Sequence, residues 1–454
     1  MTNNKVAILN GVENRDNCLE APLSELGRVL SEKNSDVKYY RLNDFNIAHC
    51  TGCFGCWIKT PGICKAADDG RDMIKSVIQS DMTILYSPVT FGGYSATLKI
   101  IVDRFIPLIL PFFGKIHGET HHLLRYSRYP RLVGIGVRNH DRKNEDQLFK
   151  ALVGRNALNF HAPSHAAEII NCNDDKETII ESLKNAISRS DPLPSGNDIL
   201  SFFPEVAGDA SFDAKQKIPG NALLIVGSPK IKHRSTSDVL GAYLLEKMKS
   251  AGWKTESLTL KRSLVREKGQ IELCSAVDRA DLIIFAFPLY IDSLPFLVTK
   301  ALEVIANHKN KSQVKKPPRV FTIINNGFPE PHHNSLALAI CRRFADRCGF
   351  NWAGALAMGA GEALCSGQEL NDTKRTGPPV KHVSKALDIA GEQLSKGKPV
   401  GPSIQNLISE SPIPMVPFGI WRWMFTNLGG RWWKQQALEN NVPKEELYAK
   451  PYAD

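Results

Sequence analysis

Four of the chain's ten cysteines lie in one short window with the spacing C-x2-C-x2-C-x7-C. They are Cys50, Cys53, Cys56 and Cys64. Glycines at positions 52, 55 and 62 permit the tight turns that let four sulfurs converge. Thiols gathered this closely in a chain with no secretory signal indicate metal ligation or redox chemistry before structural disulfides.

Four interpretations of this cysteine window remain open. Three closely spaced cysteines and a fourth further on suit a [4Fe–4S] cluster. Thiolates also suit structural zinc, although zinc sites usually come as two separated pairs. The third interpretation is a redox-active dithiol without metal, and the fourth is a set of reduced thiols that only pack. We favour the cluster over each of the others taken singly.

Length and composition predict a multidomain globular protein. A chain of 454 residues suggests two or three domains. Its 43% hydrophobic and 23% charged residues are typical of soluble proteins. No apolar run reaches the ~18 residues that cross a bilayer, so we expect no transmembrane segment and a cytoplasmic, reducing location.

The balance of charge favours anionic ligands. Lys and Arg number 57 against 47 Asp and Glu, for a formal net charge of +10. The positive charges are scattered, and we find no zinc-finger spacing, basic helix or RNA-binding signature. We therefore expect no nucleic-acid partner.

Short apolar runs alternate with helical periodicity, and the order occurs twice. Strands are expected at 5–10, 37–42, 82–86 and 131–137, and again at 222–227, 255–260, 282–287 and 320–324. Strand alternating with helix predicts βαβ units and a parallel sheet. The fold class is therefore α/β, with two tandem copies of one doubly wound plan.

The domain limits follow from changes in composition. We expect one domain over 1–190, a linker rich in Pro, Gly, Ser and Asp over 191–220, and a second domain over 221–400. Residues 401–454 form an arm rich in tryptophan and basic residues. Such a helical arm could lie on a membrane, but we favour packing over an α/β domain or a partner subunit.

The second domain has the better candidate phosphate loop. Its first strand leads into a run of hydroxyl and basic side chains before a helix: Ser228, Lys230, Arg234, Ser235, Thr236 and Ser237. Hydroxyls and N–H groups at a helix N-terminus suit a phosphate monoester. No Walker or G-x-G-x-x-G pattern is present, which disfavours a nucleoside triphosphate or a Rossmann-bound dinucleotide. A plain N-cap is the alternative.

Two further loops are expected at the same carboxyl edge of the sheet, where ligands bind in such folds. One contains Pro288, Leu289, Tyr290, Ile291 and Asp292, and the other contains Asn325, Asn326, Gly327 and Phe328. Together they offer an aromatic wall and backbone N–H groups for a flat ring. This combination predicts a flavin site.

These features resemble the flavodoxin-like NADPH-dependent FMN reductase superfamily. The cysteine window, Asp68-Asp69, Lys99 and Asp103-Arg104 are similar to its iron–sulfur flavoprotein branch, as is the loop with Pro88, Thr90, Phe91 and Gly92. The resemblance implies flavodoxin-like domains, bound FMN, a [4Fe–4S] cluster and NAD(P)H as co-substrate. The tandem duplication expected here departs from that branch, whose members usually have a single domain.

The first domain departs from the family at its phosphate loop, residues 10–17. Glu13 and Asp16 stand where the family has Ser and Thr, and their charge would repel a phosphate. We therefore expect FMN in the second domain, with the Pro88–Gly92 turn lining its other face across a domain or dimer interface. FMN in both domains is the alternative.

The remaining candidates carry less weight. His121-His122 and His332-His333 are expected to be surface or substrate-facing, because they lack metal-site spacing. The apolar run 105–113 is compatible with a subunit contact or with burial in its own chain. Six scattered cysteines are expected as small core residues: Cys18, Cys172, Cys274, Cys341, Cys348 and Cys365.

The function that follows is that of a flavoenzyme. FMN would take hydride from NAD(P)H and pass electrons to a small acceptor such as a quinone, directly or through the cluster. No catalytic residue is assigned, because hydride transfer to the flavin requires no side-chain acid or base. We expect a homo-oligomer. The alternatives are an electron carrier or redox sensor that serves a partner protein, and a zinc-stabilised scaffold without catalysis.

Overall fold

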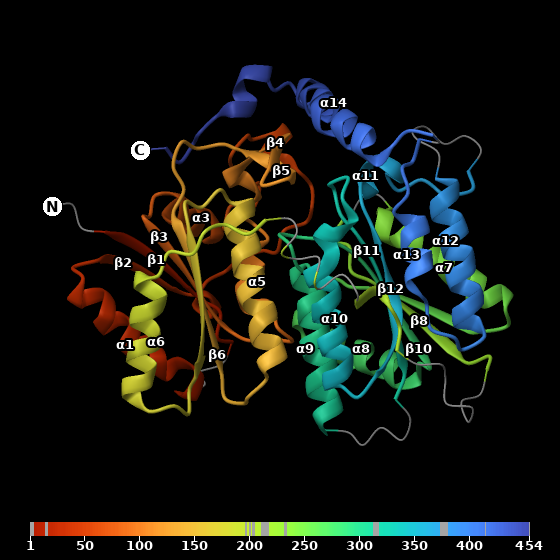
Figure 1. The fold of residues 1–454 in the computed structure, drawn as a ribbon, viewed down its shortest axis with the longest axis horizontal. Helices are drawn as coiled ribbons and strands as arrows, with labels where there is room; N and C mark the ends of the chain where they lie inside the picture. The colour runs from red at the N-terminus through yellow and green to blue at the C-terminus, as the bar shows by residue number, and fades with distance from the viewer. Residues whose placement is uncertain are drawn as a thin grey trace. The chain divides into compact units, whose positions relative to one another are not determined.

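The computed structural model describes residues 4–13, 17–195, 198, 201, 205–209, 218–230, 234–311, 317–372, 380–413 and 415–453. The chain forms two compact units (Figure 1). The first unit contains residues 1–196 and 426–454, and the second contains residues 197–425. Half of the predicted linker 191–220 lies outside the described residues.

The first unit is built on a parallel sheet of five strands. They are β1 (Lys5–Asn10), β2 (Asp36–Arg41), β3 (Met82–Pro88), β6 (Arg131–Arg138) and β7 (His165–Asn171), in the spatial order β2-β1-β3-β6-β7. The central strands are almost continuously buried, because helices cover both faces of the sheet. The strand order changes direction between β1 and β3, which marks the carboxyl edge there as the expected ligand crevice.

Helices α1 (Asn17–Glu32) and α6 (Lys176–Ser188) pack on one face, and α5 (Lys143–Asn159) packs on the other (Figure 1). Gly134 in β6 allows the close approach of α5, since a Cβ there would lie 2.2 Å from Cγ2 of Val153. The short helices are α3 (Gly70–Ile78) and α4 (Ala96–Val102).

A hairpin interrupts the βαβ pattern of the first unit. It contains β4 (Ile109–Ile116) and β5 (Glu119–Leu124), paired antiparallel. His117 and Gly118 both have positive φ, as a tight two-residue hairpin turn requires. The apolar run 105–113 forms η2 (Ile106–Leu108) and most of β4 and is largely buried, so burial in its own chain is observed.

The second unit repeats the strand order of the first. Its strands are β8 (Asn221–Val226), β9 (Lys254–Thr259), β10 (Leu282–Pro288), β11 (Arg319–Asn325) and β12 (Asn351–Met358), in the order β12-β11-β10-β8-β9. All of these pairs are parallel. Equivalent anchors recur, because Asp81 accepts from the Lys5 N–H and Asp281 accepts from the Asn221 N–H. The predicted α/β fold with two doubly wound sheets is confirmed.

Helices α7 (Thr236–Ser250), α12 (Lys381–Ser395) and α13 (Pro402–Ile408) share one hydrophobic core with the sheet of the second unit. Helices α8 (Glu267–Arg279), α9 (Phe296–Lys311) and α10 (Ser335–Arg347) lie on its other face (Figure 1). Short turns complete the unit: η4 (Arg262–Val265), η5 (Pro331–Asn334) and α11 (Gly361–Leu364).

The C-terminal arm contributes to both units. Helix α14 (Phe418–Glu439) begins in the second unit and ends in the first, where η6 (Lys444–Tyr448) follows. Residues 426–453 pack on the first unit, as Trp433 does against Phe54 and Trp57. Among the described helices, none combines the length and apolar character needed to span a bilayer.

Candidate metal centre and flavin loops

The cysteine loop lies between η1 (Leu42–Asp44) and α3, after the edge strand β2. Its tight turns depend on left-handed backbone at Gly52 (φ 61°), Phe54 (φ 52°) and Gly62 (φ 83°). Phe54 precedes the short helix α2 (Gly55–Ile58), which carries Cys56. The stacking of Phe54 on Trp57, with ring centroids 5.3 Å apart, accompanies this unusual conformation.

The four cysteines converge. Burial raises the pKa of Cys50 to about 12, and the nearby charges of Asp103, Cys64 and Cys53 add to the rise. Burial also raises the pKa of Cys56, with contributions from Cys50, Cys64 and Cys53. The sulfurs of Cys50 and Cys56 lie deep although solvent reaches part of each residue, whereas Cys53 is exposed.

The raised pKa values of Cys50 and Cys56 disfavour a free thiolate at these two positions. Redox-active cysteines need a thiolate at neutral pH and therefore a lowered pKa. At Cys50, with a pKa of about 12, the free thiol stays protonated at neutral pH. A bound metal would remove this obstacle, because thiol ligands lose their protons on binding.

The chemistry of the donor set fits a [4Fe–4S] cluster. Such a cluster takes four thiolates, with three cysteines closely spaced in sequence and a fourth further on, as Cys50, Cys53, Cys56 and Cys64 are. Structural zinc also takes four thiolates, but usually from two separated pairs.

The ion pair between Arg104 and Asp68 lies where the cysteine loop begins and ends. Arg104 Nη1 lies 2.6 Å and 2.7 Å from the two carboxylate oxygens of Asp68, and 3.3 Å from the Ala48 carbonyl. Asp68 in turn accepts from the N–H groups of Ala48 (2.7 Å) and Gly70 (3.2 Å). Because Ala48 precedes the first cysteine and Asp68 follows the last, this pair joins the two ends of the loop.

Aromatic side chains cover the loop within the first unit. The Trp57 indole N–H donates to the carbonyls of Ile106 (3.2 Å) and Ile109 (3.0 Å), which anchors α2 on the hairpin. Trp433 packs edge-on against Trp57 at 4.9 Å, and His122 lies 4.7 Å from the same ring. Burial lowers the pKa of His122 to about 3, so this histidine is neutral at physiological pH.

The histidine pairs, predicted to be surface or substrate-facing, do not lie on the surface: His121 and His333 are buried, and His122 and His332 are partly buried. His121 is buried, with Nε2 2.9 Å from Glu119 and Nδ1 3.0 Å from Asn159. His333 is also buried, 3.6 Å from Glu330. The sequence could not reveal this burial. His121 lies in the β4–β5 hairpin and His333 in the turn η5 before α10, and neither position follows from a periodic hydrophobic pattern.

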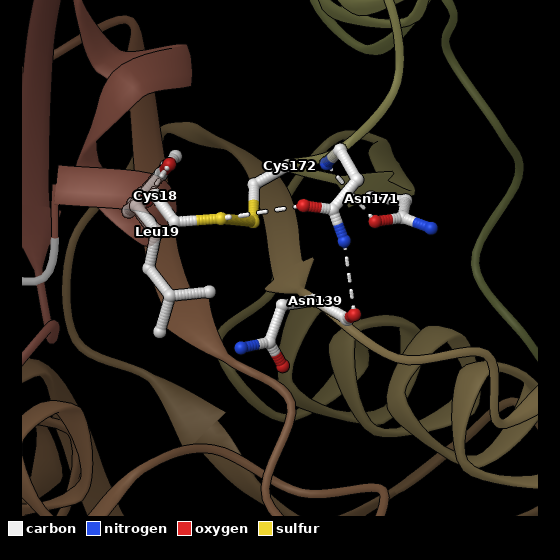
Figure 2. The surroundings of a disulfide bond; sticks show 7 residues. Cys18, Leu19, Asn139, Asn171 and Cys172 are labelled. Carbon is white, nitrogen blue, oxygen red and sulfur yellow. Dashed lines mark hydrogen bonds between the residues drawn. A yellow bond between two sulfur atoms is a disulfide. The ribbon is translucent and has the colours of Figure 1, made fainter.

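Two cysteines predicted to be small core residues form a disulfide instead. Cys18 in α1 is bonded to Cys172, which follows β7 (Figure 2). They are 154 residues apart in sequence, and the packing of α1 beside α6 brings them together. Cys274, Cys341 and Cys365 are buried free thiols, as predicted, and Cys348 is half-buried.

The three predicted flavin loops of the second unit lie together. Ser237 donates to the Asn325 side chain at 2.7 Å, which joins the first loop to the third. The Leu289 N–H donates to the Asn325 carbonyl at 2.8 Å, which joins the second loop to the third. A backbone bridge between Tyr290 and Ser293 closes the second loop on itself. Within the third loop, the Phe328 N–H donates to the Asn326 side chain at 2.8 Å.

The phosphate-loop side chains already have partners within the protein. Ser235 caps α7 by accepting from the Asp238 N–H at 3.1 Å, and Thr236 donates to the Gly361 carbonyl at 3.2 Å. Lys230 Nζ lies 2.8 Å from Glu362, and Arg234 pairs with Asp238 and Glu369. Glu362 and Glu369 thus place negative charge beside this loop.

The residues after β12 are the part of this site that sequence reasoning missed. Glu362 in α11 and Glu369 face the two cations of the phosphate loop. The Gly361 N–H also donates to the Asn326 carbonyl at 2.8 Å. The only signal available in the sequence was the glycine-rich stretch that follows the last strand of the second unit. This stretch matches no recognised ligand-binding motif.

The turns after β3 and β10, which contain other residues predicted to contact flavin, have similar backbone conformations. Ile291 and Asp292 have positive φ, as do Phe91 and Gly92 in the first unit. Phe91 is buried in its own unit, and a Cβ at Gly92 would lie 2.6 Å from Leu148. Pro88, Thr90, Ser228, Pro288 and Gly327 lie in these turns or at the strand ends beside them. Residues 14–16 of the first phosphate loop lie outside the described residues.

The fold and the site together define a flavodoxin-like α/β protein with a candidate metal centre in its first unit. Residues 4–128 match the family described as NADPH-dependent FMN reductase. This range contains all four cysteines of the candidate metal centre. The resemblance predicted from the sequence is therefore confirmed for this part of the chain.

Curated relatives include iron–sulfur flavoproteins. One from Methanocaldococcus jannaschii is 37% identical over 84 residues, which are 18% of this chain and 42% of that protein. One from Archaeoglobus fulgidus is 25% identical over 135 residues, which are 30% of this chain and 61% of that protein. The chain thus spans about two fifths to three fifths of the length of these relatives.

Solved structures with a similar fold include the apo form of an NADH:FMN oxidoreductase. It is 19% identical with a TM-score of 0.29, and the match covers 41% of this chain and 94% of that chain. An NAD(P)H:quinone oxidoreductase from Methanothermobacter marburgensis is 13% identical with a TM-score of 0.27, and the match covers 39% of this chain and 98% of that chain.

Proposed function

We propose that the protein is an NAD(P)H-dependent flavin oxidoreductase that contains FMN and a [4Fe–4S] cluster and reduces a small acceptor such as a quinone. The observation that carries this proposal is the convergence of Cys50, Cys53, Cys56 and Cys64 in one tightly turned loop. The printed names of the relatives, iron–sulfur flavoproteins, support it.

The residues around the cysteine loop would hold the cluster and exclude water. The Gly55 N–H lies 3.4 Å from the Cys53 sulfur. Such N–H groups offset the negative charge of bound thiolates. Phe54, Trp57 and Trp433 shield the same loop from solvent.

The second unit is our proposed location for FMN, which when bound supplies hydride acceptance and one-electron release. Ser235, Thr236 and the first N–H groups of α7 would hold the phosphate. The Tyr290 and Asn326 loops would face the ring. FMN in the first unit as well remains the alternative proposal, with the Pro88–Gly92 turn against the ring.

The location of the enzyme, its oligomeric state and its electron donor are also proposals. We infer a cytoplasmic homo-oligomer that takes electrons from NADH or NADPH and hands them to a small molecule. The formal net charge of +10 would favour the anionic nicotinamide and flavin nucleotides.

The test is a spectrum combined with turnover. Full-length protein is purified without oxygen, supplied with FMN and freed of unbound flavin, and NADH and NADPH oxidation is then followed with a quinone present. We expect flavin absorbance that disappears on addition of nicotinamide and returns with the quinone. Protein that retains no flavin and oxidises neither nicotinamide would overturn the proposal.

A further inference from the structure

A buried arginine in the first unit has no carboxylate partner among the described residues. Arg125 directly follows β5 and is 2% exposed. Its Nη1 donates to the carbonyls of Leu447 (2.9 Å) and Ala449 (2.7 Å), and its Nη2 donates to Ile109 (3.4 Å). Its Nε has no acceptor in the described part of the chain.

Other buried arginines of this unit are paired differently. Arg104 faces Asp68, and Arg155 faces Glu119. A guanidinium removed from water without a counter-charge costs several kcal/mol, and neutral carbonyls offset only part of this. The surroundings of Arg125 therefore favour a nearby negative charge that no described carboxylate supplies.

The cysteine loop is the neighbour that could supply this charge. Geometry places Arg125 beside this loop, because Arg125 and the indole of Trp57 both donate to the Ile109 carbonyl, and Trp57 is the residue after Cys56. Arg125 thus lies beside the thiols proposed as ligands.

Two of the three carbonyls that Arg125 binds, those of Leu447 and Ala449, belong to the C-terminal segment, residues 443–453. This segment also contacts the cysteine loop, since a Cβ at Gly62 would lie 2.5 Å from Pro451. The same Cβ would lie 3.3 Å from the Ala449 carbonyl, which accepts a hydrogen bond from Arg125. The segment therefore lies against the loop on the side where Arg125 binds it.

We propose that Arg125 is the counter-charge of the cluster and that it fixes the C-terminal segment as the outer wall of the cluster site. The inference rests on the proposed [4Fe–4S] cluster. Four thiolates make such a cluster anionic, and reduction adds negative charge. A fixed positive charge in a poorly solvated site stabilises the reduced form more, and so raises the reduction potential. Arg125 is thus a positioning residue for the wall and a tuning residue for the cluster.

The experiment compares three variants of the full-length protein, purified without oxygen. Arg125→Gln removes the charge, and Arg125→Lys keeps the charge but cannot bind both carbonyls as the guanidinium fork does. Arg131→Gln is the matched control, because Arg131 also donates to backbone carbonyls, those of Ala186 and Ile187. The readouts are iron per chain, the midpoint potential of the cluster and amide hydrogen exchange over residues 444–453.

We expect Arg125→Gln to shift the midpoint potential to more negative values and to speed exchange in the segment about tenfold. Arg125→Lys should keep the midpoint near that of the wild type while exchange still rises. Arg131→Gln should change neither quantity.

Results that differ from these expectations overturn either the counter-charge, the wall or the cluster. An iron-loaded Arg125→Gln variant with the wild-type midpoint overturns the counter-charge, and one with wild-type exchange overturns the wall. Wild-type protein without iron overturns the proposed cluster itself, and with it the counter-charge. Hydrogen exchange in that iron-free protein would still decide whether Arg125 holds the segment.

Discussion

Asp68 and Arg104 connect the chain before the first cysteine to the chain after the last. Both side chains are nearly inaccessible, and hydrogen bonds to backbone groups satisfy much of their remaining capacity. Compared with apolar side chains, a buried ion pair of this kind adds little to the free energy of unfolding. Loss of one partner is costly, because the other charge then stays buried without a counter-charge. The pair therefore specifies the shape of the cysteine loop.

Replacing Asp68 by Asn should be strongly destabilising, because Arg104 would keep its charge in a dry site. We expect the free energy of unfolding to fall by about 3 to 5 kcal/mol in urea titrations. The control is Lys184→Gln, which breaks the exposed pair with Glu32 and should cost at most about 1 kcal/mol. Equal losses in the two variants would show that the buried pair has no special role.

The redox state of Cys18 and Cys172 in cells tests the proposed location of the protein. A reducing cytoplasm keeps such pairs as thiols, whereas oxidising compartments preserve the disulfide. If the protein is cytoplasmic, rapid trapping in cells with a thiol-alkylating reagent should label both cysteines without prior reduction. Peptides that remain linked after trapping would contradict a reducing location.

Among the elements, the buried strands could be predicted best. Runs such as Val6–Leu9 and Leu282–Phe287 are continuously apolar because helices cover both faces, so local sequence carries the signal. The cysteine loop could be recognised because the spacing of its thiols is local as well. The hairpin β4–β5, the Cys18–Cys172 bond and the Lys230–Glu362 pair could not, since each depends on contacts between segments distant in sequence.

Strand β5 gives the first unit a pH dependence through His122. The folded pKa of about 3 lies below the unfolded value near 6.5, so the folded state disfavours protonation. Stability is complete above the unfolded pKa and is lost as pH falls from 6.5 towards 3. The loss across the whole window should be on the order of 4 kcal/mol.

The corresponding measurement is urea unfolding between pH 7 and pH 4. His122→Gln should lose stability less steeply with falling pH than the wild type does, because glutamine cannot be protonated in this range. His140→Gln, at an exposed position, should follow the wild-type curve. Parallel curves for wild type and His122→Gln would contradict the account.

The short helix α11 should lower the affinity of the second unit for FMN. Glu362 neutralises Lys230 and would repel a flavin phosphate, so Glu362→Gln should tighten FMN binding by about fivefold. Fluorescence titration measures this, with riboflavin as the ligand that lacks the phosphate and Glu392→Gln as the exposed control. Unchanged FMN affinity, or an equal gain for riboflavin, would place the phosphate elsewhere.

At the scale of the whole molecule, two units with one strand order differ in their loops. The first unit contains the four cysteines and the residues matched to FMN reductases. The second contains the turn proposed for the flavin phosphate, with hydroxyl groups that the first lacks. The sequence predicted this difference from local composition, whereas the contacts of Arg125 with Leu447 and Ala449 depend on the folded chain.

The central claim is that the cysteine loop holds iron and sulfide. Protein purified without oxygen should contain about four irons and four acid-labile sulfides per chain, and a paramagnetic signal should develop on reduction. Cys50→Ser should lose this iron, and Cys274→Ser, at a buried thiol of the second unit, should retain it. Zinc without iron in the wild-type protein, or iron that survives Cys50→Ser unchanged, would contradict the account.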